Sequence, residues 1–121
     1  VRTPPERLQA FITHHVGFFA RNLAAMKVLS HEANSLSGEW QARVNATKRR
    51  YVNLLERLLA DVNPDQPGPE RSAAAYALFG MMNWLYNWYD PAGALAPEQL
   101  AELMARLFLS GFTEGVTTWP R

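Results

Sequence analysis

One stretch decides the fold of this chain: Leu78-Phe79-Gly80-Met81-Met82-Asn83-Trp84-Leu85-Tyr86-Asn87-Trp88-Tyr89. Together with the alanine-rich residues before it, this stretch predicts a helix from Pro69 or Glu70 to Tyr89 that is apolar almost all round. A helix without a polar side is buried on every side. Because a chain of 121 residues can cover only one of its faces, we expect a second copy to cover the opposite face. The stretch therefore predicts a homodimer.

Two asparagines, Asn83 and Asn87, fall in a narrow polar stripe of this predicted helix. An unsatisfied buried amide costs about 1–3 kcal/mol, so both are expected to face a ligand, water or a partner group. Leu78, Leu85 and Tyr89 lie on the far side of the stripe and are expected to contact the second copy. Aromatic and methionine side chains most often fill a core, so simple packing remains the alternative for each residue taken alone.

Four further helices are predicted from start signals and apolar spacing. The first begins at Thr3-Pro4-Pro5-Glu6, with Thr3 as N-cap and Glu6 closing a capping box, and runs to about Arg21. The others are predicted over residues 23–32, from the N-cap Ser37 to residue 62, and over residues 97–112. Turn-forming residues separate them at 34–38, 63–69 and 90–93. No useful β-alternation occurs, so the fold class is all-α, with five helices in one domain over residues 1–121.

Composition excludes several classes of protein. Twelve basic and eleven acidic residues give a net charge of +1, so no global charge indicates nucleic-acid or membrane-surface binding. This balance combines +5 over residues 1–60 with −4 over the remainder. The absence of cysteine excludes disulfides, a thiol nucleophile and thiolate metal sites, and is typical of a cytoplasmic protein. No apolar run approaches the roughly 20 residues that a membrane span needs.

Catalytic and metal-binding motifs are missing from the sequence. It contains no phosphate-binding glycine loop, no HExxH and no GxSxG. His14 and His15 are neighbours on one helix and point about 100° apart, so they cannot chelate one metal ion. No acid–base or nucleophilic set can be assembled. We therefore expect neither an enzyme nor a bound metal or cofactor.

Two positions are candidates for ligand contacts. His15 lies between Phe11 and Phe19 on one helical face, so it is either a core histidine satisfied by a hydrogen bond or a polar anchor in an apolar cavity. Arg50 follows two other basic residues and lies beside the apolar stripe of its helix. It could hold an anionic ligand group at a pocket mouth, although a solvated basic face is the simpler alternative.

A resemblance to a known family rests on the second half of the chain. The residues that carry it are Gly80-Met81-x-Asn83-Trp84-x-Tyr86-x-Trp88-Tyr89, Pro91-x-Gly93, Pro97-Glu98-Gln99-Leu100 and the closing 107–112. In these the chain resembles the C-terminal regulatory domain of the TetR family of bacterial transcription regulators, and more loosely so over its whole length. It looks most similar to the branch that senses acyl-CoA or steroid-derived CoA thioesters. Asn87 and Ala96 depart from the pattern, where a charged residue and a Ser or Thr cap are expected.

The resemblance implies an all-α domain that dimerises and binds an effector. Its last two helices would form a four-helix bundle with those of a second subunit, and DNA would be bound only through an N-terminal helix-turn-helix domain outside these residues. A small, largely apolar effector such as an acyl-CoA is implied. The expected ligand-binding residues are Phe11, His15, Phe19, Trp40, Arg50, Tyr51, Asn83, Trp84 and Asn87. The expected dimer residues are Leu78, Leu85, Tyr89, Leu103, Leu107 and Phe108. A dimeric helical interaction module without a small-molecule ligand is the alternative.

Overall fold

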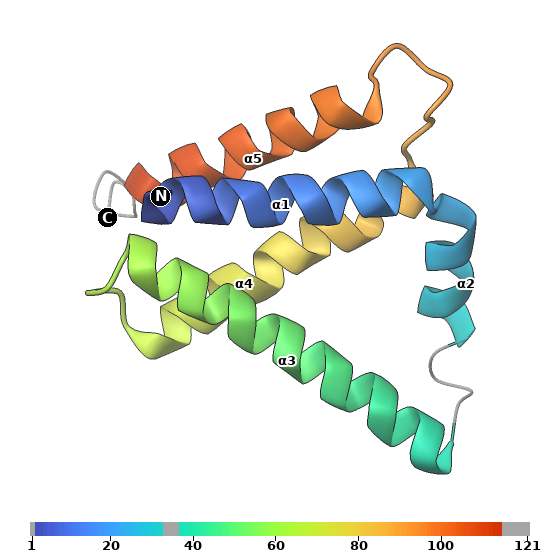
Figure 1. Ribbon diagram of the computed structural model, residues 1–121, viewed down its shortest axis with the longest axis horizontal. Helices are drawn as coiled ribbons and strands as arrows, with labels where there is room; N and C mark the ends of the chain where they lie inside the picture. Colours follow the sequence, from blue (N-terminus) through green and yellow to red (C-terminus); the bar gives the residue numbers. More distant parts are fainter. Residues whose placement is uncertain (1, 33–36, 115–121) are drawn as a thin grey trace, which may run out of the picture.

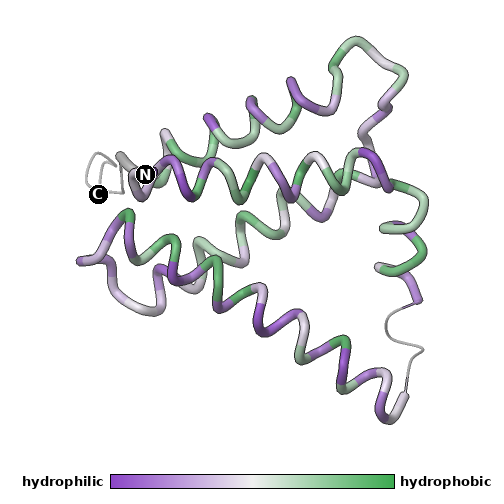
Figure 2. Tube along the Cα trace, in the orientation of Figure 1, coloured by the Kyte–Doolittle hydropathy of each residue, from purple (hydrophilic) through white to green (hydrophobic). Residues whose placement is uncertain are grey.

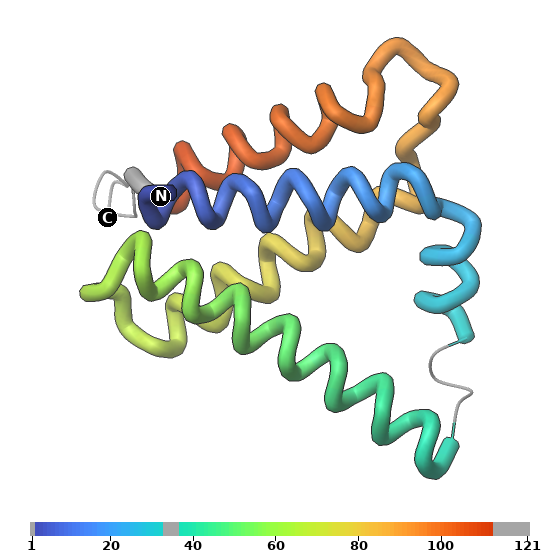
Figure 3. Tube along the Cα trace, in the orientation of Figure 1, coloured from blue at the N-terminus to red at the C-terminus, as the bar shows by residue number. Residues whose placement is uncertain are grey.

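The computed structural model describes residues 2–32 and 37–114, and these residues form helices without any strand. The elements are α1 (Pro4–Arg21), α2 (Leu23–Glu32), α3 (Gly38–Val62), α4 (Gly68–Asn83), η2 (Trp84–Asn87) and α5 (Pro97–Glu114). In Figure 3, α3 and α4 make an antiparallel hairpin, and α5 runs back along α1. The predicted all-α class with five α-helices is confirmed. Among these helices, none combines the length and the apolar character that crossing a membrane requires.

Helix α1 lies in the middle of the molecule, with α5 on one side and α3 and α4 on the other (Figure 1). Its start is the predicted capping box, in which the Thr3 hydroxyl accepts from the Glu6 N–H and the Glu6 carboxylate accepts from the Thr3 N–H. Its residues Leu8, Ile12 and Val16 follow at four-residue spacing and are completely buried. One face of α1 therefore supplies the centre of the core.

The remaining core residues come from every element except α2. They are apolar and almost fully buried, and they include Leu55, Leu59, Ala75, Leu78, Met82, Leu85, Tyr89, Leu100, Ala101, Met104, Ala105 and Phe112. The hydrophobic effect contributes roughly 1.5–3 kcal/mol for each large apolar side chain that is fully buried. The core thus places α3, α4 and α5 around α1 and fixes their positions.

Side-chain hydrogen bonds hold the connector between α3 and α4 in place. The Arg71 guanidinium donates through Nη2 to the backbone oxygens of Asn63, Pro64 and Gln66, at 3.3, 3.3 and 3.0 Å. The Asn63 amide donates to the backbone oxygen of Phe112 at the end of α5. Carbonyl groups of the connector, which no helix pairs, find hydrogen-bond donors in this way. The proline-rich stretch is consequently tied both to α4 and to α5.

The helix predicted to run to Tyr89 ends earlier than expected. Helix α4 stops at Asn83, and the tighter 3-10 helix η2 follows. Pro91 disfavours a helical conformation at Asp90, so no helix continues beyond this segment. Because a 3-10 helix has 3.0 residues per turn instead of 3.6, the side chains after Asn83 point elsewhere than a continuous helix would place them.

Helix α2 and the N-terminal half of α3 contribute no buried residue to the core, although the partly buried Leu23 at the start of α2 packs against it. No residue of α2 is buried, although Figure 2 colours much of it as hydrophobic. In α3 the buried residues are Leu55 and Leu59, both in the C-terminal half, and Figure 1 shows its N-terminal half diverging from α1 and α4. Residues 34–36 of the predicted turn lie outside the described residues, and Ser37 stands at the N-cap without a capping hydrogen bond from its side chain. Apolar surface is therefore left uncovered on this side.

Candidate functional site

His15 is the one buried polar or charged residue among the described residues, and it connects three helices. From α1, its Nε2 atom lies 2.9 Å from Oδ1 of Asn83, the last residue of α4. Its Nδ1 atom lies 3.3 Å from the hydroxyl oxygen of Tyr51 on α3. Buried polar groups require such partners, and His15 has one at each ring nitrogen.

Aromatic rings surround this histidine. The Phe19 ring stacks on the imidazole at a centroid distance of 4.4 Å, and the Phe79 ring lies 5.7 Å away. Phe11 contacts both the imidazole and Tyr51, at 6.1 and 5.1 Å. These side chains, which we call the His15 cluster, are Phe11, His15, Phe19, Tyr51, Phe79 and Asn83. The cluster is therefore an aromatic wall that contains two hydrogen bonds, one on each side of the His15 ring.

The His15 cluster is electrically neutral. Burial lowers the pKa of His15 below its ordinary value, an effect that the Asn83 hydrogen bond partly opposes and the neighbouring His14 reinforces. In the neutral ring, the Nε2–H group donates to Asn83 Oδ1, and Nδ1 accepts from the Tyr51 hydroxyl. Burial also raises the pKa of Tyr51. The cluster therefore presents hydrogen-bonding groups without a formal charge.

The lowered pKa of His15 predicts that acid weakens the fold. Below the ordinary pKa of 6.5, the unfolded chain binds a proton at this residue that the folded chain resists, so the free energy of unfolding falls as the pH falls. Urea titrations between about pH 7.5 and 5 should show a smaller pH dependence for His15→Gln than for the wild type. His14→Gln, a change at the adjacent exposed histidine, should retain most of the wild-type dependence, because burial is a larger cause of the lowered His15 pKa than His14 is. Equal pH dependence in His15→Gln and the wild type would contradict this assignment.

The structure brings together five of the nine predicted ligand-binding residues: Phe11, His15, Phe19, Tyr51 and Asn83. Trp84 and Asn87 do not join them. Trp84 is 59% exposed, and the Asn87 amide donates to the Trp84 backbone oxygen instead. Both residues belong to η2, whose tighter turn moves Asn87 off the face that Asn83 occupies, while Trp84, as the next residue along the chain, does not share that face in either kind of helix.

Trp40 and Arg50 also lie outside the cluster, although both are on α3 with Tyr51. Trp40 is 65% exposed, and the Arg43 guanidinium lies 5.2 Å above its ring. Arg50 is exposed and donates to the hydroxyl of Thr47, which is one turn from Tyr51 on the same helical face. The Arg50 guanidinium is thus drawn towards the edge of that face without contacting the rings.

Phe79 is the cluster residue that the sequence interpretation missed. Its ring contacts His15, Tyr51 and Phe11, at 5.7, 5.8 and 6.3 Å. It precedes Asn83 by four residues, so the two lie on the same face of α4. This four-residue spacing from Asn83 was the sequence signal that could have identified Phe79 as a cluster residue.

Three of the predicted dimer residues, Leu78, Leu85 and Tyr89, are core residues of the single chain. Leu78 and Leu85 have no exposed surface, so they offer nothing to a second copy, and their prediction as interface residues is wrong. Tyr89 is also buried, and its hydroxyl donates to the Leu95 backbone oxygen at 2.6 Å. Leu103 and Leu107 of α5 are 39% and 61% exposed and are available to a partner.

Phe108 is partly buried within the chain, where it packs against the core and its ring stacks on Phe112 at 5.5 Å. The apolar residues exposed on α4 and just after it differ from those predicted. Tyr76 is 63% exposed and Trp88 is 55% exposed. A Cβ atom added to Gly80 would meet nothing within 4 Å, so this small residue faces open space. The face of α4 that a second helix could approach is therefore the one opposite Leu78.

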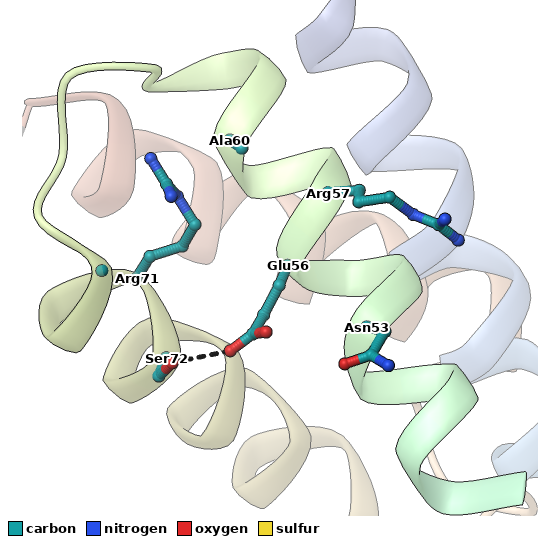
Figure 4. Close-up of a pocket in the computed structure, with 7 residues that line it drawn as sticks. Asn53, Glu56, Arg57, Ala60, Arg71 and Ser72 are labelled. Atoms are coloured by element: carbon teal, nitrogen blue, oxygen red, sulfur yellow. Dashed lines mark hydrogen bonds between the residues drawn. The ribbon is translucent and has the colours of Figure 1, made fainter.

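A separate surface pocket lies where α3 and α4 meet near their connector (Figure 4). Its volume is about 380 Å³, and the Ser72 hydroxyl donates to the Glu56 carboxylate at 2.7 Å beside it. The lining residues are Asn53, Glu56, Arg57, Ala60, Gly68, Arg71 and Ser72. None of these belongs to the predicted ligand set, and most are polar. This pocket is distinct from the His15 cluster.

Comparisons with solved structures support the fold. The crystal structure of a TetR-family transcriptional regulator from Bordetella parapertussis 12822 has a TM-score of 0.84 at 22% identity, covering 98% of this chain and 62% of that one. The structure of AibR in complex with isovaleryl coenzyme A and operator DNA has a TM-score of 0.75 at 30% identity, covering 88% and 60%. A TetR/AcrR-family regulator from Thermobifida fusca YX-ER1 has a TM-score of 0.74 at 27% identity, covering 100% and 61%. The chain thus spans about three fifths of the length of these proteins.

Sequence comparison gives the family. No curated protein matches the chain. The family described as "Tetracyclin repressor-like, C-terminal domain" matches residues 1–112, which is nearly the whole chain. This match agrees with the helices observed and with the resemblance in the second half of the sequence. The chain therefore belongs to the TetR-like C-terminal domain family, the regulatory domain of TetR-type transcription regulators.

Proposed function

We propose that this domain is the effector-binding and dimerisation part of a TetR-like transcriptional repressor. It senses a small, largely apolar ligand at the His15 cluster and controls DNA binding by an N-terminal domain of the same protein. The observation that carries this proposal is His15 itself, a buried neutral histidine that joins α1, α3 and α4 within an aromatic wall. A few polar groups set in an apolar lining are typical of small-molecule sites.

Uncovered apolar side chains on the elements around the cluster support the same proposal. Val28 and Leu29 of α2 are 60% and 48% exposed. Trp40 lies on the α3 face that carries Tyr51, three turns towards the N-terminus, and it is also largely exposed. An apolar ligand seated against the cluster would cover part of this surface, which the chain alone leaves open to water.

An acyl-CoA is the ligand class that we favour. AibR, which is similar to this chain, has been solved with isovaleryl coenzyme A bound. Such a molecule joins an apolar acyl chain to an anionic nucleotide, so it suits an aromatic wall with basic residues nearby. We propose that Arg50, at the edge of the Tyr51 face, holds one of the anionic groups. Trp40 would lie on the path between the two ends of the ligand.

Acyl-CoAs should raise the melting temperature of the domain. A ligand at a hundred times its Kd stabilises the folded state by about 2.7 kcal/mol, which raises Tm by several degrees in a domain of this size. Differential scanning fluorimetry with isovaleryl-CoA and longer acyl-CoAs measures this. Arg50→Ala should reduce the shift, whereas Arg49→Ala, an adjacent exposed arginine farther from the Tyr51 face, should not. The acyl-CoA proposal is abandoned if no acyl-CoA changes Tm.

A dimeric helical interaction module without a ligand is the second candidate. It is favoured by the fact that both ring nitrogens of His15 already have partners within the chain. Under this proposal the hydrogen bonds of the cluster only hold α1, α3 and α4 together. Acyl-CoAs and other apolar ligands then leave Tm unchanged. The melting experiment therefore separates the two candidates.

A further inference from the structure

We propose that Asn83 selects ligands with an uncharged polar group. Its side-chain amide recognises a carbonyl group, such as that of a thioester or amide. The site rejects the free carboxylate of the same acyl chain. This inference rests on the proposed function, because it assumes that a ligand binds at the His15 cluster. It goes further by assigning a chemical preference to one residue.

The first step is to count which hydrogen-bonding groups of the cluster are already used. The Nε2–H group of His15 donates to Oδ1 of Asn83, and Nδ1 of His15 accepts from the Tyr51 hydroxyl. The Nδ2 group of Asn83 donates to no residue in the part of the chain that the structure describes. Asn83 is also exposed, so a ligand can reach this amide. The unused group next to His15 is thus a hydrogen-bond donor.

The second step is the absence of a positive charge that could balance a carboxylate. Within the described residues, no lysine or arginine makes an ion pair or hydrogen bond with a member of the cluster; the Arg50 side chain, for example, donates to Thr47. Burial lowers the pKa of His15 and so disfavours the charged form of its imidazole. A carboxylate seated against the rings of the cluster would lose part of its hydration without gaining a charged partner, and this is costly. A neutral carbonyl oxygen accepts from Asn83 Nδ2 without this penalty.

The third step is the position of Asn83 relative to Asn87. Both are exposed asparagines, four residues apart, but only Asn83 contacts His15. The Asn87 amide donates to the backbone oxygen of Trp84. An Asn→Asp change adds the same charge at either position, so Asn87→Asp is a matched control for Asn83→Asp.

The test uses two probes of one chain length, decanamide and decanoate, whose binding is measured by calorimetry beside the acyl-CoA series. We expect the wild type to bind decanamide at least about tenfold more tightly than decanoate, because only the amide avoids an unpaired buried charge. Asn83→Asp should weaken the binding of decanamide at least about tenfold, since a carboxylate that repels the ligand's carbonyl oxygen replaces the donor. Asn87→Asp should bind decanamide as the wild type does. Circular dichroism establishes that both variants remain folded.

The outcomes separate this inference from the proposed function. Equal binding of the two probes, or binding of acyl-CoA with neither probe, overturns the role of Asn83 and leaves the effector proposal standing. Equally weakened decanamide binding in both variants also overturns it, because a general charge effect then explains the result. If neither the probes nor any acyl-CoA binds, the effector proposal fails and the inference fails with it. Should Asn83→Asp not fold, Asn83→Ala, which removes the donor without adding a charge, is expected to lose decanamide binding in the same way.

Discussion

Leu78→Ala should lower the free energy of unfolding by about 2–5 kcal/mol. Leu78 is completely buried in the core of the single chain, so its loss removes apolar contacts and leaves a cavity. Domains of this size are stable by roughly 5–15 kcal/mol, which makes the expected loss a large fraction of the total. Urea denaturation followed by circular dichroism measures it.

Protein concentration distinguishes a core residue from an interface residue. The midpoint of Leu78→Ala should fall by the same amount at low and high protein concentration, because the lost contacts lie within one chain. Leu107→Ala, at a position that is 61% exposed, should have a small effect that depends on concentration. If Leu78→Ala does not fold, Leu78→Met, which conserves volume, should cost less than about 1.5 kcal/mol. A Leu78→Ala protein as stable as the wild type but weaker in self-association would show that Leu78 is an interface residue after all.

The double substitution Leu103→Glu and Leu107→Glu should convert the proposed homodimer to monomers. The two leucines lie four residues apart on α5 and are partly exposed in the single chain, so a second copy would have to cover them. Two carboxylates there would be buried without partners on association, and we expect the dissociation constant to rise at least about a hundredfold. Sedimentation velocity at micromolar concentration measures the change.

Folding of each chain should survive this double substitution. The exposed positions contribute little to the core of the single chain, so the far-ultraviolet circular dichroism of the double variant should match that of the wild type. Ala42→Glu places a carboxylate on an exposed position of α3 and should leave the dimer intact. A wild-type protein that sediments as a monomer refutes the dimer proposal. A double variant that remains dimeric shows that α5 does not form the interface.

Local signals in the sequence predicted the helices well. The capping box at Thr3 and Glu6 and the start at Pro97 depend on contacts within one turn, which neighbouring residues decide by themselves. The end of α4 at Asn83 could not be predicted in this way. Over a single turn, apolar spacing does not distinguish 3.0 from 3.6 residues per turn, so the prediction ran on to Tyr89.

The candidate site was likewise predictable only in part from local signals. Phe11, His15 and Phe19 follow at four-residue intervals, so the helical period alone places them on one face. That Asn83 and Tyr51 reach the two nitrogens of His15 depends on how α3 and α4 pack against α1. Phe79 was missed because its role depends on the same packing.

By itself, the sequence determined that this protein is an all-α domain with a helix too apolar for one chain to cover, and which of its residues share a helical face. Only the tertiary structure decided which face of each helix is buried. Leu78 enters the core while Tyr76, two residues earlier, remains 63% exposed. A helix with apolar residues on all sides has no preferred inward direction of its own, so the surfaces of the neighbouring helices select the one that is buried.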